Sequence, residues 1–277
     1  MAAWLIAHSQ LLYTAAIVGG FAAVAVWETV APLRQPQAAL GPRWGTNIAL
    51  LAINSVVVHA VLPLTAVAAA AWAQGRGWGL LNGLAWPSPM AGLLAGLMGL
   101  LGLLGLDLAR WLLHHAMHRV GWLWRLHRVH HSDTDYDCTI GLRFHPLEAV
   151  IGAAAMVGVV LLLGVPPAVV VLSDVLTIAL GYVAHGNVSL PPRWDRGLRR
   201  VFVTPDMHRV HHSCVRRESM SNFGAVFSFW DRGFGSYLAA PSAGHRGMTI
   251  GLEDLREPGQ LTLLQLLKLP LRVRLRA

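Results

Sequence analysis

Histidine is concentrated in three short motifs that are suited to binding metal ions. The sequence contains one HxxxH motif, beginning at His114, and two HxxHH motifs, beginning at His127 and His208. On a helix, positions i, i+3 and i+4 share one face, so each HxxHH motif is expected to direct three imidazoles toward one point, and HxxxH two. The histidines predicted as metal ligands from these motifs are His114, His118, His127, His130, His131, His208, His211 and His212.

A ninth ligand is predicted at His185, which ends a later apolar run. So many imidazoles converging without a cation would bury mutually repelling or unsatisfied groups, which is costly. A structural zinc ion takes about four ligands, commonly including cysteine. We therefore predict two metal ions, each bound by four or five nitrogens, with room for a small exogenous ligand.

Neutral imidazoles do not compensate the charge of two metal ions, so acidic partners for their other N–H groups are expected. Asp107 and Asp206 are the candidates, and an ordinary helix-end role is the alternative. Asn187 and Asn222 are interpreted as turn caps more readily than as groups that bind a water molecule at the centre. Four histidines are not expected to bind metal, namely His8, His59, His115 and His245.

Long apolar runs predict that these motifs are carried by membrane helices. Of the 277 residues, 55% are hydrophobic and 13% are charged. Residues 11–30, 48–73 and 90–106 are apolar over lengths that suit a span of a hydrocarbon layer about 30 Å thick. The third helix is expected to continue past the membrane to His118. Residues 1–106 are accordingly assigned to transmembrane spans.

Two further apolar runs, 149–165 and 168–183, are separated by Pro166 and Pro167 and flanked by arginine on both sides. They predict a membrane hairpin at about 149–183 within a catalytic region of residues 107–240. Residues 241–277 read as a cytosolic or interfacial tail, in which Pro270 is expected to break any helix. The predicted fold is thus an all-α, polytopic membrane helical bundle with a cytosolic, histidine-rich di-metal cap.

The distribution of basic residues predicts the topology. The net charge is +8, yet only Arg34, Arg43 and Arg76 of the 22 basic residues precede position 107. With such long apolar runs, a cytoplasmic face against anionic lipid is favoured over nucleic-acid binding. We expect the amino terminus and the Arg76 loop outside, and the Arg34 loop and the histidine motifs in the cytoplasm. A single lysine among the basic residues is typical of a GC-rich bacterial genome, and hence of a bacterial cytoplasmic membrane.

Seven segments, always in one order, carry a resemblance to a known family. They are His114-x3-His118, residues 122–132, Arg143-Phe-His145-Pro146-Leu-Glu148, His185-Gly-Asn187, residues 204–212, Asn222-Phe-Gly224 and residues 230–237. Together they resemble the motif series of the sterol desaturase/fatty acid hydroxylase superfamily over roughly residues 107–238.

The resemblance implies a non-haem di-iron centre that uses O2 and an external electron donor, such as a reductase with a ferredoxin or a cytochrome. It carries the ligand role to the nine predicted histidines and gives His145 a supporting or structural role. The expected activity is hydroxylation or desaturation of a C–H bond in a membrane lipid, which is a fatty acyl, sterol or isoprenoid, or amino-lipid. Iron is the expected metal, and zinc can displace it during overexpression, because zinc normally binds imidazole sites more tightly than ferrous iron does.

Two other functions are weighed against this one. A metal transporter would need ionisable residues along a path through the membrane, whereas the first two spans offer only Glu28 and His59. A zinc-dependent membrane hydrolase would need a general base, and the sequence has no HExxH motif. Substrate, electron donor and oligomeric state are not specified by the sequence.

Overall fold

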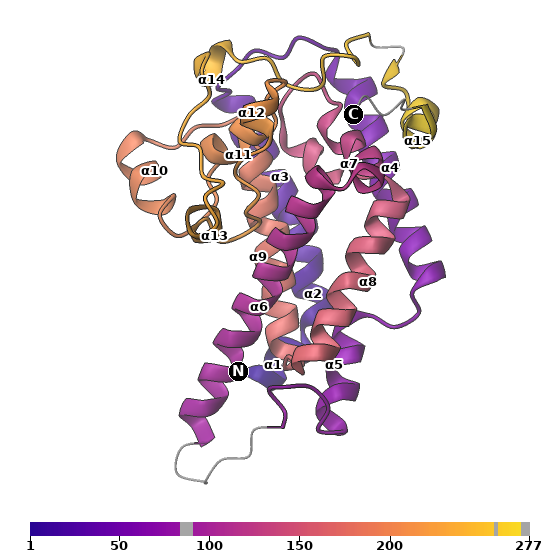
Figure 1. Cartoon of the computed structure of the whole chain (residues 1–277), viewed down its shortest axis with the longest axis vertical. Coiled ribbons are helices and arrows are strands. Elements are labelled where there is room, and N and C mark those ends of the chain that lie inside the picture. The colour runs from indigo at the N-terminus through magenta and orange to yellow at the C-terminus, as the bar shows by residue number, and fades with distance from the viewer. Residues whose placement is uncertain (84–90, 258–259, 273–277) are drawn as a thin grey trace.

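The computed structural model describes residues 1–83, 91–257 and 260–272. Within these ranges the chain forms helices and no strand, apart from two isolated bridges, Phe202 with Phe227 and Ser213 with Ile250. The prediction of an all-α helical bundle with a histidine-rich cap is confirmed. Figure 1 shows an elongated bundle with the short helices of the cap gathered at one end and the amino terminus at the other.

In the described part of the chain, five helical segments are long and apolar enough to cross a membrane, namely Ser9–Val30, Leu40–Gly75, Gly92–Arg119, Pro146–Leu163 and Pro167–His185. The bundle helices are α1 (Ala2–Ala7), α2 (Ser9–Thr14), the π-helix η1 (Ala15–Gly19), α3 (Gly20–Val30), α4 (Leu40–Val61), α5 (Ala66–Gly75), α6 (Ala91–Arg119), α8 (Pro146–Leu163) and α9 (Pro167–His185). The cap contains α7 (Gly121–His131), the 3-10 helix η3 (Cys138–Leu142), α10 (Pro192–Leu198), α11 (Pro205–His211), α12 (Arg216–Ser219), α13 (Phe229–Gly233), α14 (Gly244–Gly247) and α15 (Leu263–Arg272).

The second predicted span is longer than expected and is interrupted. It begins at Leu40 and breaks between α4 and α5, where Pro63 cannot donate a helical hydrogen bond. The hydroxyl of Thr65 restarts the helix by accepting a hydrogen bond from the Ala68 amide at 3.2 Å. The third span belongs to the 29-residue α6, which continues through His118 as predicted. Its predicted first residue, Met90, lies outside the described residues.

Helices α8 and α9 form the hairpin that the apolar runs suggest, and each begins with proline at a position where no N–H is needed. Gly164 ends α8 with φ +69°, a conformation that favours glycine. The far end of the hairpin touches the loop after α5, where Leu80 and Leu81 donate to the carbonyls of Leu162 and Leu163. Ala69 and Ala70 of α5, Leu106 of α6 and Val160 of α8 are buried in the core between these helices.

Arginine loops lie at opposite ends of the bundle. Arg34, after α3, donates hydrogen bonds to the carbonyls of His245, Arg246 and Met248 in the cap. Arg76, after α5, lies at the end that meets the hairpin turn. The Arg34 loop therefore shares a side with the histidine motifs, and the Arg76 loop does not.

The expected helix break at Pro270 is wrong. Pro270 lies inside α15, in its last turn, so it removes few hydrogen bonds from the helix. Leu266 and Leu269 are buried against Leu50 of α4 and Val129 of α7, and this packing holds the helix together. Residues 273–277, the basic end of the predicted tail, lie outside the described residues.

Candidate metal centre

Four helices, two of the bundle and two of the cap, bring the histidine motifs together. The end of α6 carries His114 and His118, and α7 follows directly with the first HxxHH motif. The end of α9 supplies His185, and α11, with the residue after it, supplies the second HxxHH motif. Proline at the start of α11 and of α9 sets where these helices begin, and hence where their histidines lie.

The nine histidines predicted as ligands form two groups, in each of which one nitrogen per residue lies within 4.8 Å of the others. The first group is His114, His118, His127, His131 and His211. The second group is His130, His185, His208 and His212. His115 belongs to neither, because its ring stacks on Trp111 at 5.2 Å and packs against Phe223.

Each HxxHH motif is divided between the two groups, so the expectation that its three imidazoles converge on one point is wrong. In the first motif, His127 and His131 lie in the first group and His130 in the second. In the other motif, His208 and His212 lie in the second group and His211 in the first. Positions i+3 and i+4 differ by about 100° around a helix, because a turn takes about 3.6 residues. A motif placed between two centres therefore sends its i, i+4 pair one way and its i+3 residue the other.

The five Nε2 atoms of the first group are buried and have no hydrogen-bond partner among the described residues. Native proteins rarely leave buried polar atoms unpaired, because each costs roughly 1–3 kcal/mol. Five such atoms, close enough together to share one cation, fit a metal-binding site.

Nδ1 contacts fix the ring orientation of several histidines. His114 donates to the Phe223 carbonyl at 2.9 Å, and His211 to the Ser221 carbonyl at 2.7 Å. His127 Nδ1 donates a hydrogen bond to Glu148 Oε1 at 2.6 Å. Because Nδ1 carries the hydrogen in each ring, the Nε2 lone pair is left to face the centre.

The second group is arranged around its Nε2 atoms. His185 Nε2 lies 3.3 Å from that of His130 and 2.9 Å from that of His208. His212 Nε2 lies 3.2 Å from His208 Nε2. A metal ion bonded to imidazoles at about 2.1 Å needs its nitrogens within about 4.2 Å of one another, and these distances meet that requirement.

Burial favours the neutral form of five imidazoles of the cap. It lowers the pKa of His130, His131, His208 and His212 well below the usual value, and neighbouring imidazoles lower it further. Burial also lowers the pKa of His211, to about 3. Neutral imidazole is the form that binds metal, so no proton has to be removed first at neutral pH.

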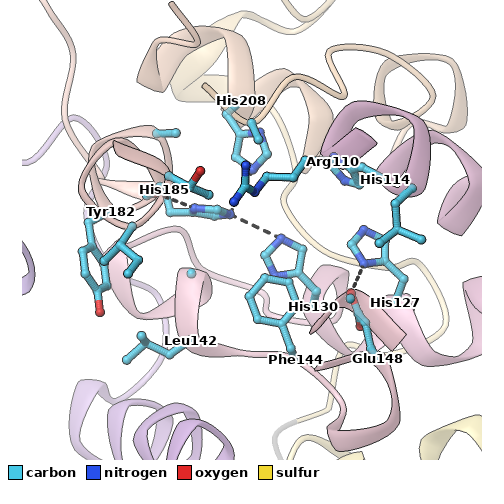
Figure 2. A pocket seen from close by; sticks show the side chains of 18 of the residues that line it. Arg110, His114, His127, His130, Leu142, Phe144, Glu148, Tyr182, His185 and His208 are labelled. Carbon is cyan, nitrogen blue, oxygen red and sulfur yellow. Dashed lines mark hydrogen bonds and ion pairs between the residues drawn. The ribbon is translucent and has the colours of Figure 1, made fainter. Parts of the chain in front are cut away.

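A largely apolar cavity of about 530 Å³ opens beside the two groups. Figure 2 shows His114, His127, His130, His185 and His208 at its wall. The remaining lining comes mainly from α6, α8 and α9, including Leu113, Met117, Met156 and Ile178. The cavity therefore extends from the histidines between helices long enough to span a membrane, and its lining suits an aliphatic chain.

Sequence comparison gives the family. The fatty acid hydroxylase family matches residues 99–236, about half of the chain, and this range contains all nine clustered histidines. The chain belongs to the fatty acid hydroxylase family. No solved structure matches it at a significant level.

Curated relatives share about half of the chain. Alkylglycerol monooxygenase of Caenorhabditis elegans is 29% identical over 137 residues, which cover 48% of this chain and 25% of that protein. Ornithine lipid hydroxylase OlsE of Rhizobium tropici is 30% identical over 135 residues, which cover 49% and 40%. Human alkylglycerol monooxygenase is 29% identical over 161 residues, which cover 57% and 33%. The matched part of this family member thus spans between a quarter and two fifths of these relatives' length.

The two aspartates expected to support the histidines have other partners. Asp107 accepts hydrogen bonds from the amides of Val226 and Phe227 and from Trp230 Nε1, all near 3 Å. Asp206 pairs with Arg209 at 2.7 Å. Neither carboxylate contacts a clustered imidazole in the described part of the chain, and the contacts that both make fit the alternative structural role.

Asn187, Asn222 and His145 are also structural. Asn187 exchanges two hydrogen bonds with the Arg34 backbone, and Asn222, at φ +54°, bridges the backbone of Met207 and Leu238. His145 Nδ1 caps α8 by accepting from the Leu147 amide at 3.2 Å. These three residues hold segments that flank the histidines.

Glu148 is the acidic partner that sequence reasoning missed. Its side chain is 5% exposed, lines the cavity, and contacts His127 from the first turn of α8. The available signal was the His145-Pro146-Leu-Glu148 motif, in which proline starts the helix and places the carboxylate on its first turn. The same signal had pointed to His145 instead.

Proposed function

We propose that the protein is an oxygen-dependent di-iron hydroxylase that acts on a C–H bond of a membrane lipid. The observation that carries the proposal is the gathering of nine imidazoles, in groups of five and four, beside an apolar cavity between membrane-length helices. The names of the relatives, monooxygenases and a lipid hydroxylase, favour hydroxylation over desaturation.

The donor set fits two transition-metal ions, since every group offers four or more imidazole nitrogens and no thiolate. When bound, two iron ions would supply the redox chemistry with oxygen that no side chain provides. The protein's own part is to hold the ions through the nine histidines, to orient His127 through Glu148, and to exclude water with the apolar cavity wall.

The overall reaction requires an outside source of electrons. One oxygen atom of O2 enters the C–H bond to give an alcohol, and the other leaves as water, which consumes two electrons and two protons. A reductase acting through a ferredoxin or a cytochrome is the proposed donor. Its absence from an assay would therefore stop turnover.

The cap is proposed to face the cytoplasm of a bacterial cell. Basic residues favour the cytoplasmic side, and Arg34 and Arg43 lie on the cap side of the bundle. Reporter fusions after Arg76 and after Ala240 should report opposite sides of the membrane. Finding both on one side would contradict the proposed topology.

Metal analysis and reconstitution test the activity. The expected result is two metal ions per chain, possible partial occupancy by zinc as isolated, and lipid products carrying one added oxygen atom only after iron loading with O2 and reductant. Product formation by zinc-loaded protein without O2 would favour the zinc hydrolase instead.

A further inference from the structure

An ion pair that belongs to neither histidine group joins two of the membrane-length helices. Arg110 of α6 contacts Asp174 of α9 at 2.7 Å and Ser173 at 2.8 Å. The hydroxyl of Tyr13 donates to the second oxygen of Asp174 at 3.1 Å. Charged side chains in this environment are costly and usually mark a functional site.

Arg110 differs from its partners in its position. Arg110 lines the cavity that the histidines line, one helical turn before His114, whereas Tyr13, Ser173 and Asp174 are not among the residues that line it. Figure 2 labels Arg110 among the side chains that line the cavity, together with His185 and His208. An ion pair whose only role was to join helices would not need its guanidinium at the wall of an apolar cavity.

The charge balance indicates what the guanidinium can bind. Guanidinium has five N–H donors, and two hydrogen bonds from it are formed with the described residues. Asp174 already compensates its charge, so an anionic group is not required. A guanidinium whose charge is already balanced can still donate a hydrogen bond to an uncharged acceptor, such as an ether, hydroxyl, ester or amide oxygen.

We propose that Arg110, held by Asp174 and Ser173, binds an uncharged acceptor oxygen of the lipid that occupies the cavity. The substrate class is then an amphiphile with an oxygen function inside the cavity, and plain hydrocarbon chains bind less well. This inference rests on the proposed function, because it takes the cavity to be the substrate site.

Binding tests it without turnover. Full-length protein loaded with redox-inactive zinc is incubated with labelled 1-O-hexadecylglycerol or labelled hexadecane, and the dissociation constants are compared. Replacing Arg110 by Met together with Asp174 by Leu should weaken alkylglycerol binding about ten- to a hundredfold, the value of a hydrogen bond to a charged group. Hexadecane binding should change less than about twofold.

Thr14→Val is the matched control, because it removes a polar side chain from the same set of helices outside the cavity lining. It should leave both dissociation constants unchanged. If the double variant does not fold, Arg110→Lys keeps the ion pair but loses the planar donor set, and should still weaken alkylglycerol selectively.

Equal weakening of both probes, or no change in either, would overturn the anchor role. Because zinc-loaded protein performs no oxidation, a failure of the oxygenase proposal would leave this binding result intact. Conversely, loss of selective binding in an enzyme that still hydroxylates lipid would reject only the role of Arg110.

Discussion

The two histidine groups are built from the same motifs but differ in support and in exposure to the cavity. Three of the five rings in the first group are fixed through Nδ1 by groups outside the histidine's own helix, namely Phe223, Glu148 and Ser221. In the second group, His185 is fixed by the Gly181 carbonyl of its own helix, and His130 stacks on Phe144.

The second group, which has less support through Nδ1, has more contact with the cavity than the first. Three of the four histidines in the second group line the cavity, against two of the five in the first. The first group thus has more nitrogens and firmer orientation, and the second has fewer nitrogens and more contact with the space where a lipid would lie. We infer that the first group holds its ion more tightly and that the second offers the more open coordination.

The largest predicted effect follows from removing one nitrogen from either group. His185→Ala leaves three histidines in the second group, so metal content should fall from two ions to one and activity should be lost. His118→Ala leaves four in the first group, enough for a tetrahedral site, so metal should be retained with weaker affinity. Metal analysis of purified variants checks both predictions.

His8→Ala is the control, because His8 is exposed and bonds only to its own helix. It should keep two ions and full activity. If His185→Ala also kept two ions, the division into groups of five and four would be wrong.

The next effect is the acid sensitivity of the metal-free protein. Burial lowers the pKa of the cap histidines in the folded state, so below the unfolded value of about 6.5 the unfolded chain binds more protons than the folded one. Stability should therefore fall as the pH falls below about 6.5, by up to about 1.4 kcal/mol per pH unit for each such group. Thermal midpoints near pH 7.5 and pH 5.5 test this, and equal midpoints would contradict it.

The nine histidines could be predicted from their local spacing, but their division into two groups could not. HxxxH and HxxHH spacings place imidazoles on one side of a helix whatever surrounds it, so the nine residues could be chosen from sequence. Which group receives His130 or His211 depends on how α7 and α11 are rotated against each other, and this rotation is set by packing between segments about 80 residues apart.

Long-range contacts explain the remaining errors. Asp107 accepts hydrogen bonds from residues 119 to 123 positions later in the chain. Glu148 contacts a histidine 21 residues earlier. Neither pairing has a local sequence signature. The prediction that Pro270 breaks a helix depends on backbone propensity alone. The burial of Leu266 and Leu269 outweighs that preference. Apolar run length, by contrast, is a property of the segment itself, which is why the membrane-length helices were found.

A smaller effect is expected when the contact between Glu148 and His127, which orients a ring of the first group, is weakened. Glu148→Gln keeps the shape of the side chain but removes the negative charge of the group that accepts the hydrogen bond from His127. The affinity of the first group for metal should therefore fall about ten- to a hundredfold. Metal titration with a chelator measures the change. Asp206→Asn is the matched control, because Asp206 pairs with Arg209 and should leave metal affinity unchanged. An equal loss in both variants would mean that Glu148 acts only through general stability.

The smallest effect concerns His145, a histidine that belongs to neither group. His145 caps α8 through Nδ1, and its Nε2 lies 3.2 Å from the Leu267 carbonyl of α15. His145→Ala should therefore lower the free energy of unfolding by about 1 kcal/mol, the usual value of a lost cap, while the protein keeps two metal ions. His145→Asn restores a capping side chain and should recover most of that loss. Loss of a metal ion in His145→Ala, not recovered in His145→Asn, would instead place His145 among the metal-binding residues, and the comparison of five against four nitrogens would have to be redrawn.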